Sequence, residues 1–332
     1  MALCYCEIPA KEEIDSLNWQ LKSAIQRLCA ALPAGQEAAY YWLQRQFGAL
    51  RHPADPTQMW EATVEIVTEL RGIGFEIRGA RVLEVGTGRR IDMPLGLYLC
   101  GAGPIVTVDL HPYLKPELLM QSVDAIRRDR DHIRRIFLPA VPASELDPKL
   151  NRLAQIRDAE ELMREARIDY RAPADAAQTG LPAASIDLQI SYTVFEHVPR
   201  PVLAAILNEG SRVLSHDGVA CHHIDPSDHF SHDDKSISAI NFLRFNDIEW
   251  AHRADNQFAY HNRMRVTDFE ALYRECQQEI LAWDTHIDSR SQQELSSAFP
   301  LAPHFQTIPA EILATTVVRA FSRPARPRDY PQ

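Results

Sequence analysis

Apolar side chains recur at helical spacing over the first eighty residues. Between Ile14 and Leu32 they repeat every three or four positions, which predicts one apolar stripe on a helix that ends at Pro33. Two further helices are predicted over residues 36–47 and 57–72. We therefore expect residues 1–76 to form an N-terminal helical cap. The stripe consists of Ile14, Leu17, Leu21, Ile25, Leu28 and Leu32.

The pattern changes after residue 80 to short apolar runs separated by glycine. The run Val82 to Val85 suits a buried parallel strand, and Gly86 and Gly88 follow it where the backbone must turn tightly. A second apolar run, residues 104–110, carries Asp109 near its end. This order of a strand, a glycine turn, a helix and a strand ending in an acid predicts the nucleotide-binding half of an α/β domain. In such a half the carboxylate accepts hydrogen bonds from ribose hydroxyls.

The sequence of the loop distinguishes between the nucleotide cofactors that could bind there. A dinucleotide fingerprint needs a small residue at position 91, and Ile91 stands there, which disfavours NAD. Instead, Glu84-x-Gly86-x-Gly88 resembles the first motif of class I S-adenosylmethionine-dependent methyltransferases. The third glycine that is common in that family is replaced here by Arg90.

Three later segments are also similar to motifs of this family, in the family's order. Residues 170–176 resemble the third strand and its loop, residues 181–198 the fourth strand and its turn, and residues 210–218 the turn into the fifth strand. The resemblance implies an α/β fold with a Rossmann-like, seven-stranded, mostly parallel sheet and helices on both faces, over residues 77–323. It implies S-adenosylmethionine as the cofactor. The residues implied around it are Glu84, Gly86, Thr87, Gly88, Asp109, Leu110, Asp175, Ala176 and Ser191.

Residues 112–167 are a predicted helical insert, because the fold usually needs a single helix there. Two charged helices are expected in it, over residues 116–135 and 143–167. Five arginines crowd the first of them, and they could hold an oxyanion of the acceptor; we favour a solvated helix paired with its own acids. The cluster is Arg127, Arg128, Arg130, Arg134 and Arg135.

The segment after the fifth strand, residues 221–234, is rich in histidine and aspartate. It leaves a carboxyl end of the sheet, where ligands of open α/β folds bind, and a histidine can take a proton from a hydroxyl or amine. Our candidates for catalysis are His229, His223 and Asp228, in that order. Because side chains alternate along a strand, only one of His222 and His223 can point to a given face. A divalent metal in this segment is a less favoured alternative, since no spacing matches a recognised ligand signature.

A second insert is expected on the acceptor side, over residues 226–266. Its last part offers hydrogen-bond donors that could bind a hydroxylated or anionic acceptor, or could equally tie the insert to the sheet. These donors are Tyr260, His261, Asn262, Arg263 and Arg265. Residues 280–287 and 311–321 are predicted to form a hairpin at the sheet edge, and residues 324–332 a mobile tail.

The family resemblance also bears on the N-terminal cap, since such helices often form a lid and part of the acceptor pocket in small-molecule methyltransferases. The aromatic residues Tyr40, Tyr41 and Trp42 could serve there, although aromatic helix faces are usually core, which we favour.

The composition limits the kinds of binding partner that we expect. The formal net charge of -10 argues against nucleic acid, and the six scattered cysteines show no zinc spacing and suggest reduced thiols in the cytoplasm. We find no signal peptide and no apolar run of about twenty residues, so no membrane association is expected. A homodimer is compatible with these features.

The sequence therefore predicts an S-adenosylmethionine-dependent methyltransferase acting on a small molecule, with an oxygen acceptor preferred, in natural-product or surface-glycan biosynthesis. Three alternatives remain open: methylation of a macromolecule such as a protein, a non-catalytic S-adenosylmethionine-binding protein, and an NAD-binding protein.

Overall fold

The computed structural model describes residues 18–47, 50–51, 53, 55–254, 256 and 258–325. Ile14, Leu17, Cys4, Cys6 and residues 326–332 lie outside these described residues. The chain divides into two compact units, which we describe separately. The first comprises the described residues up to Ala39, Ser227–Tyr260 and Ile287–Ala314; the second comprises Tyr40–Pro226, His261–His286 and the chain from Thr315. The boundaries proposed from sequence for the cap and the inserts stay predictions.

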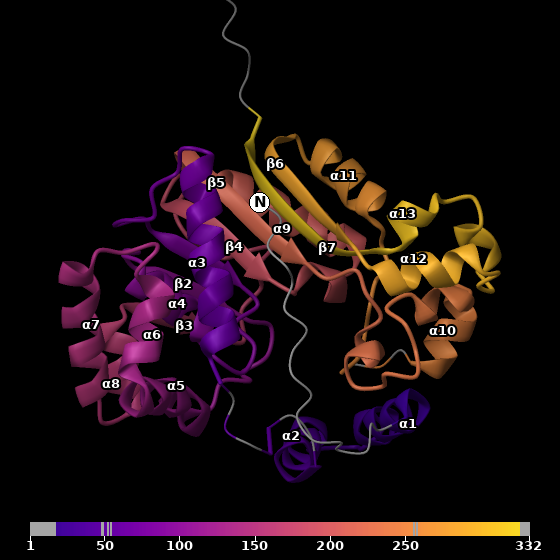
Figure 1. Cartoon of the computed structure of the whole chain (residues 1–332), viewed down its shortest axis with the longest axis horizontal. Helices are drawn as coiled ribbons and strands as arrows, with labels where there is room; N and C mark the ends of the chain where they lie inside the picture. Colours follow the sequence, from indigo (N-terminus) through magenta and orange to yellow (C-terminus); the bar gives the residue numbers. More distant parts are fainter. Residues whose placement is uncertain are drawn as a thin grey trace, which may run out of the picture. The chain divides into compact units, whose positions relative to one another are not determined.

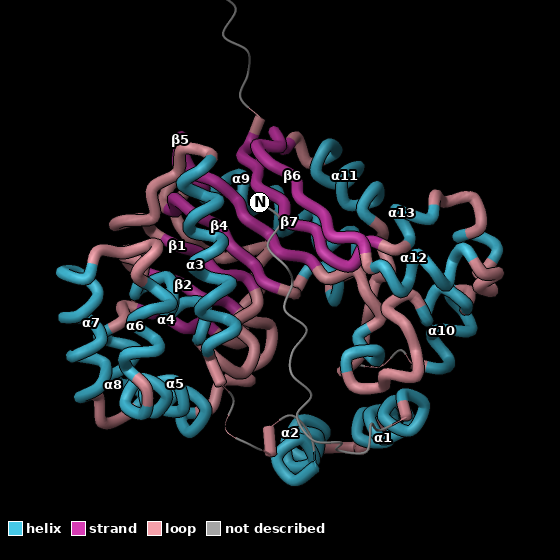
Figure 2. Tube along the Cα trace, viewed as in Figure 1, coloured by secondary structure: helices cyan, strands magenta, loops and turns pink. Residues whose placement is uncertain are grey.

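The second unit is built on a seven-stranded sheet with the order β3-β2-β1-β4-β5-β7-β6 (Figure 2). The pairs β1–β2, β1–β4, β2–β3 and β4–β5 are parallel, and β5–β7 is antiparallel. This confirms the predicted Rossmann-like, mostly parallel sheet. The strands are β1 (Val82–Val85), β2 (Ile105–Val108), β3 (Ile168–Arg171), β4 (Ile186–Tyr192), β5 (Leu214–Ile224), β6 (Gln278–Ile287) and β7 (Thr315–Pro324).

Helices cover both faces of this sheet, and the consecutive residues His222 and His223 of β5 point to the two opposite faces. His222 of β5 packs its ring 6.2 Å from that of Tyr273 in α11 (Val266–Glu275). The next residue, His223, points to the opposite face and pairs with Arg319 of β7, which forms an ion pair with Glu69 of α3 (Thr57–Gly72). Helix α9 (Arg200–Val213) packs against β5 and α11 (Figure 1).

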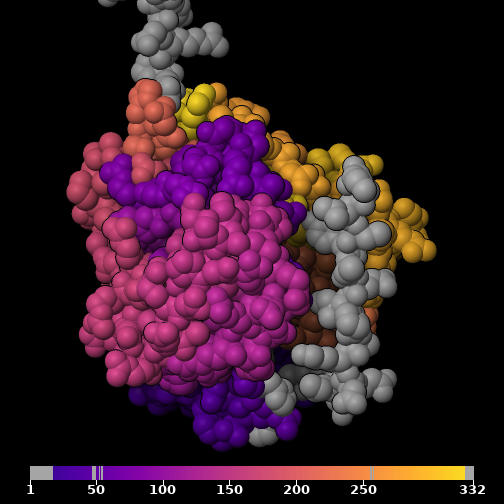
Figure 3. Space-filling model, turned by 60° about the vertical axis from the view of Figure 1, so that its left-hand side comes forward, coloured from indigo at the N-terminus to yellow at the C-terminus, as the bar shows by residue number. Residues whose placement is uncertain are grey.

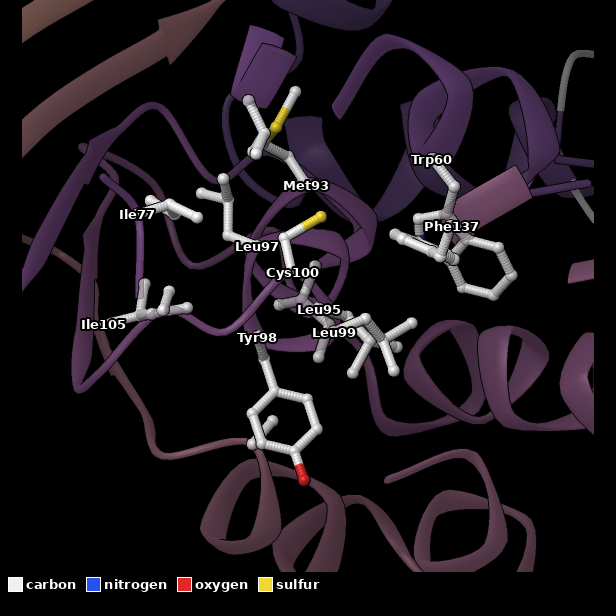
Figure 4. Close-up of a cluster of buried hydrophobic side chains, with 14 of the residues drawn as sticks. Trp60, Ile77, Met93, Leu95, Leu97, Tyr98, Leu99, Cys100, Ile105 and Phe137 are labelled. Atoms are coloured by element: carbon white, nitrogen blue, oxygen red, sulfur yellow. The ribbon is translucent and has the colours of Figure 1, made fainter. Parts of the chain in front are cut away.

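The main core lies between the sheet and the helices α3, α4 and α6 (Arg130–Phe137). Helix α4 (Asp92–Leu99) is buried along its whole length, because its side chains are apolar on nearly every side. Trp60 of α3 meets Phe137 of α6 at 5.9 Å between ring centroids (Figure 4). Tyr98 points its hydroxyl out of this cluster toward Glu165, to which it donates a hydrogen bond of 2.6 Å.

The helical insert contains four helices rather than the two that the sequence predicted. They are α5 (Pro116–Arg128), α6 (Arg130–Phe137), α7 (Ala143–Gln155) and α8 (Ala159–Glu165), and they form one continuous surface in Figure 3. The prediction missed two breaks at aspartates. Asp129 and Asp158 leave helical geometry and cap the next helix, each accepting a backbone N–H with its side chain.

Two arginines of the predicted cluster, Arg127 and Arg134, connect helices of the insert. Arg127 of α5 donates to the carbonyl oxygens of Ala154 and Ile156, and Arg134 of α6 forms an ion pair of 2.7 Å with Asp147 of α7. These contacts favour the structural interpretation of the cluster over an oxyanion site.

The first unit has its own core of aromatic side chains. Trp19 at the start of α1 (Trp19–Ala30) lies 5.7 Å from Phe230 and 6.1 Å from Trp250, between ring centroids. The other elements of this unit are η2 (His229–His232), η3 (Asn241–Arg244), α10 (Asp247–Arg253), α12 (Ser289–Ser296), η4 (Pro303–Phe305) and α13 (Ala310–Leu313). Residues 311–313 were predicted as strand and are helical; β7 begins only at Thr315.

The apolar stripe predicted for the first helix is wrong in its orientation. Leu21 and Leu28 are 52% and 71% exposed, whereas Ser23 and Gln26 are buried. The position of Trp19 in the aromatic core, with the bond from Ser23 Oγ to the carbonyl of Arg253, turns this other face inward. The second helix, α2 (Gln36–Phe47), and α3 have the predicted bounds.

Two observations bear on the remaining predictions from composition. The four described cysteines, Cys29, Cys100, Cys221 and Cys276, are free and buried. Among the described residues, no helix has both the length and the apolar character needed to cross a membrane.

Candidate cofactor site

The loop after β1 can be formed only with glycine at its first position. Gly86 and Gly88 both have positive φ, of 84° and 65°. Gly86 donates its N–H to the carbonyl of Val108 at 2.8 Å, which holds the loop against β2. A Cβ atom on Gly88 would meet nothing within 4 Å, so this part of the loop faces open space. The backbone can therefore be approached closely by a ligand.

Asp109 and Leu110 follow β2 and lie beside this loop. The Gly88 N–H donates to Asp109 Oδ2 at 2.7 Å, and the His111 N–H donates to Asp109 Oδ1 at 2.9 Å. Asp109 is half-buried, and Leu110 is 65% exposed. The structure thus brings together the glycine loop and the acid that the sequence proposed for the ribose.

Glu84 lies in the interior of β1, below the loop. The hydroxyl of Thr107 donates a hydrogen bond to its carboxyl, and the Thr87 and Thr107 hydroxyls are bonded to each other. Burial raises the pKa of Glu84 to about 8, against the Thr107 hydrogen bond; the charges of Asp109 and Asp92 raise it further. A negative charge on Glu84 is therefore costly unless a cation comes close.

The loop after β3 is joined to the same group through the backbone. The Ala174 N–H donates to the carbonyl oxygen of Asp109 at 2.9 Å. Asp175 is exposed and accepts the N–H of Ala177 at 2.8 Å, and Ala176 is half-buried. Both residues follow Ala174 directly in the loop after β3.

Ser191 has a different environment from the other proposed cofactor residues. It is fully buried, and its hydroxyl is bonded to Nδ1 of His222 at 2.8 Å. The His222 ring also stacks on Phe195 at 4.2 Å. Among the described contacts, none joins the Ser191 side chain to Glu84 or Asp109.

The three candidates for catalysis are divided between the two units. His223 belongs to the second unit, where its ring stacks on Tyr192 at 4.2 Å. Burial lowers its pKa to about 4, and the charge of Arg319 contributes to this. Asp228 and His229 belong to the first unit.

In the first unit, Asp228 and His229 differ in accessibility. Asp228 is 1% exposed and accepts hydrogen bonds of 3.0 Å from both Asn241 Nδ2 and the Phe230 N–H; burial raises its pKa to about 6. His229 is half-buried and stacks on His232 at 4.8 Å.

Asn262 and Arg265 tie their segment to the loops that follow β4 and β5. Asn262 Nδ2 donates to the carbonyls of Phe195 and Val198, at 2.7 and 2.9 Å. Arg265, which is 1% exposed, donates to the carbonyl of Pro226 at 2.5 Å. Of the two interpretations that the sequence left open, these contacts favour the structural one.

Sequence reasoning assigned no role to two loop residues, Arg89 and Arg90. The Arg89 guanidinium lies over the rings of Tyr41 and Tyr113, at 5.3 and 4.9 Å. Arg90 forms an ion pair with Asp92 at the start of α4. The signal that could have identified them is the pair of consecutive arginines directly after Gly88, where the chain departs from the family pattern.

Comparisons with known proteins agree with the sequence motifs. Residues 137–222 match the family model described as a methyltransferase domain. None of the curated proteins matches the chain. Similar solved structures include the 1,6-didemethyltoxoflavin-N1-methyltransferase of Burkholderia thailandensis, with 13% identity over 90% of this chain and 93% of that one and a TM-score of 0.42. Another is a geranyl diphosphate methyltransferase, with 14% identity over 90% and 94% of the two chains and a TM-score of 0.41.

Proposed function

We propose that this chain, a class I S-adenosylmethionine-dependent methyltransferase, methylates a small molecule and that an oxygen atom is the preferred acceptor. The observation that carries the proposal is the hydrogen bond from Gly88 to Asp109. It places a backbone loop that a ligand can approach beside an acid that can bind a ribose, at the carboxyl ends of two parallel strands.

The residues present fit the cofactor. Gly88 leaves room for a ligand against the backbone, and Asp109 supplies a carboxylate for the ribose. The buried Glu84 has a pKa of about 8, so its ionised form would be stabilised by a cation such as S-adenosylmethionine. When bound, this cofactor supplies an electrophilic methyl group on a sulfonium. Glu84, Asp109 and the loop would hold and orient it; Asp175 and Ala176 are proposed at the adenine.

Positioning does most of the catalysis in this kind of transfer, and a base is needed when the acceptor carries its proton at neutral pH. We assign this role to His229. Burial and Arg319 hold the pKa of His223 at about 4, too low for an efficient base near pH 7. Both oxygens of Asp228 accept hydrogen bonds, and its side chain is closed off from solvent.

The acceptor class is proposed from the chain's charge. A net charge of -10 gives no general attraction to nucleic acid, and Arg134 and Arg127 of the insert bond to an acid and to carbonyl oxygens of the insert itself. Natural-product or surface-glycan biosynthesis remains the proposed setting.

The test is transfer of labelled methyl from S-adenosylmethionine into extracts separated by size. Label in the small-molecule fraction supports the proposal, and sensitivity of that label to alkaline hydrolysis distinguishes an ester from an ether or amine. Label confined to macromolecules would overturn the acceptor class. The Asp109→Asn variant serves as the control, since its weaker cofactor binding should lower the label in every fraction.

A further inference from the structure

The loop between β1 and α4, residues 86–91, is called the cofactor loop here. We propose that Arg90 is a positioning residue that fixes the cofactor loop to helices α4 and α5 and thereby sets the affinity for S-adenosylmethionine. This inference rests on the proposed cofactor role of the loop. Arg90 stands where the family commonly has its third glycine, so this chain carries a long charged side chain at that point of the loop.

The Arg90 guanidinium has partners on two helices. Its Nε donates to Asp92 Oδ2 at 2.5 Å, and a terminal nitrogen donates to Gln121 Oε1 at 2.6 Å. The side chains of Arg90 and Asp92 are only 17% and 8% exposed. Because the planar guanidinium has donors in a fixed fork, it fixes direction as well as distance, which a lysine ammonium does not.

The partners are themselves held in place. Ser122 Oγ donates to Asp92 Oδ1 at 2.5 Å, and Trp60 Nε1 donates to the Asp92 carbonyl at 3.1 Å. Gln121 and Ser122 are consecutive residues of α5, and Trp60 is fully buried in α3. The anchor therefore joins the loop to three helices whose own positions are set by the main core.

The two ends of the loop are held by different groups. Gly86 and Gly88 are bonded at the β2 side, to the Val108 carbonyl and to Asp109. At the other end, the Arg90 side chain makes the described bonds to α4 and α5. Without Arg90 the loop would lose its side-chain bonds to α4 and α5, and Asp92 would keep a buried charge without its cation. The loop would then adopt its binding conformation only part of the time in the free protein, and this lowers the affinity for the cofactor.

The same anchor gives the helical insert a function. Helix α5 lies in the predicted insert, residues 112–167, and its Gln121 and Ser122 both bond to the Arg90–Asp92 pair. The insert thus supports the cofactor loop as well as adding surface.

The experiment compares S-adenosylhomocysteine binding by the full-length wild type with that of Arg90→Ala and Arg90→Lys in calorimetric titrations. We expect roughly a tenfold rise in Kd for Arg90→Ala, since a small misplacement of a binding group has effects of this order or larger. Arg90→Lys should restore part of the affinity, because it returns the charge to Asp92 without the fork. Guanidinium ion at millimolar concentration should partly rescue Arg90→Ala and leave the wild type unchanged.

Arg134→Ala is the matched control. It also removes an arginine–aspartate pair from the insert, with Asp147, but this pair does not touch the loop. Its Kd should equal that of the wild type. Hydrogen exchange at the amides of residues 87–91 should accelerate in Arg90→Ala and not in Arg134→Ala.

If Arg90→Ala does not fold, Gln121→Met decides the question, because it keeps the buried ion pair and removes only one acceptor of the guanidinium. It should weaken binding severalfold; an unchanged Kd would overturn the inference. An unchanged Kd for a folded Arg90→Ala would do the same. Failure of the wild type to bind S-adenosylhomocysteine would instead refute the proposed function, so the two failures are distinguishable.

Discussion

Gly86 lies directly against Val194, since a Cβ atom built on Gly86 would come within 2.5 Å of Val194 Cγ2. Gly86 also has a φ of 84°. We therefore expect Gly86→Ala to lose both stability and cofactor binding. Left-handed backbone geometry costs an alanine about 1–2 kcal/mol, and the contact with a stiff β-branched side chain adds to this. Urea denaturation and titration with S-adenosylhomocysteine measure the two effects.

Gly180→Ala is the control that separates the two costs expected for Gly86→Ala, backbone strain and steric contact. Gly180 has a φ of 68°, but a Cβ there would have no neighbour within 4 Å. This variant should show the backbone cost alone and bind the cofactor normally. If Gly86→Ala were no less stable than Gly180→Ala, the close packing of the loop on Val194 would be refuted.

Cofactor binding is expected to depend on pH through Glu84. With a pKa of about 8, this carboxyl is mostly protonated at pH 7. A bound sulfonium or ammonium would favour the ionised form, so binding should release a proton and the affinity for S-adenosylmethionine should rise between pH 6 and 8. Calorimetry in buffers of different ionisation enthalpy measures the released proton.

Glu84→Gln is the control for this linkage, because it keeps the size of the side chain and cannot ionise. Its affinity should be lower at pH 8 and nearly independent of pH. Proton release by Glu84→Gln equal to that of the wild type would show that another group titrates. The same raised pKa makes the stability of the free protein fall as pH rises from about 4.5 through 8, since the folded state binds the proton more tightly than the unfolded state in this window.

Acid should destabilise the protein through the histidines of β5. Burial lowers the pKa of His222 to about 3 and that of His223 to about 4, whereas an unfolded histidine titrates near 6.5. The unfolded state therefore binds more protons below pH 6.5, and stability is lost as the pH falls toward these values, by up to about 1.4 kcal/mol per pH unit for each histidine.

Urea denaturation at pH 7, 6 and 5 tests this expectation on His222→Asn, which keeps a polar partner for Ser191. The variant should be less stable than the wild type at pH 7, and the difference should shrink at pH 5. A difference independent of pH would contradict the neutral, buried state of His222. His216→Asn is the matched control, because His216 is an exposed residue of the same strand.

The cofactor loop was the part of the site that sequence could predict, and the reason is local. Gly86, Gly88 and Asp109 owe their positions to backbone geometry and strand order, which short motifs encode directly. The orientation of α1 was predicted wrongly because Trp19 and Ser23 are directed by partners more than two hundred residues away in sequence. A helical period alone cannot identify which face those partners cover.

The catalytic candidates illustrate the same limit. His223 and Asp228 are five residues apart in sequence, yet they belong to different compact units, because the chain leaves the second unit after Pro226. Neighbouring positions in a polar segment therefore did not indicate neighbouring roles. Arg90 was noticed but given no role for a related reason: its partner Gln121 lies in the predicted insert, which no family motif describes.

Asp109 provides the most direct test of the cofactor site. Its two oxygens accept hydrogen bonds from the N–H groups of Gly88 and His111. An asparagine side chain has the same size but only one acceptor oxygen. Asp109→Asn should therefore loosen the loop and weaken S-adenosylhomocysteine binding about 10- to 100-fold, since hydrogen bonds to a charged group contribute about 1.5–3 kcal/mol. Asp158→Asn, which changes an aspartate that caps α8 instead, should lower stability slightly and leave the Kd unchanged. Equal affinity of Asp109→Asn and the wild type would remove Asp109 from the site, whereas a loss in Asp109→Asn with normal binding by Asp158→Asn would place the ribose at the carboxyl end of β2.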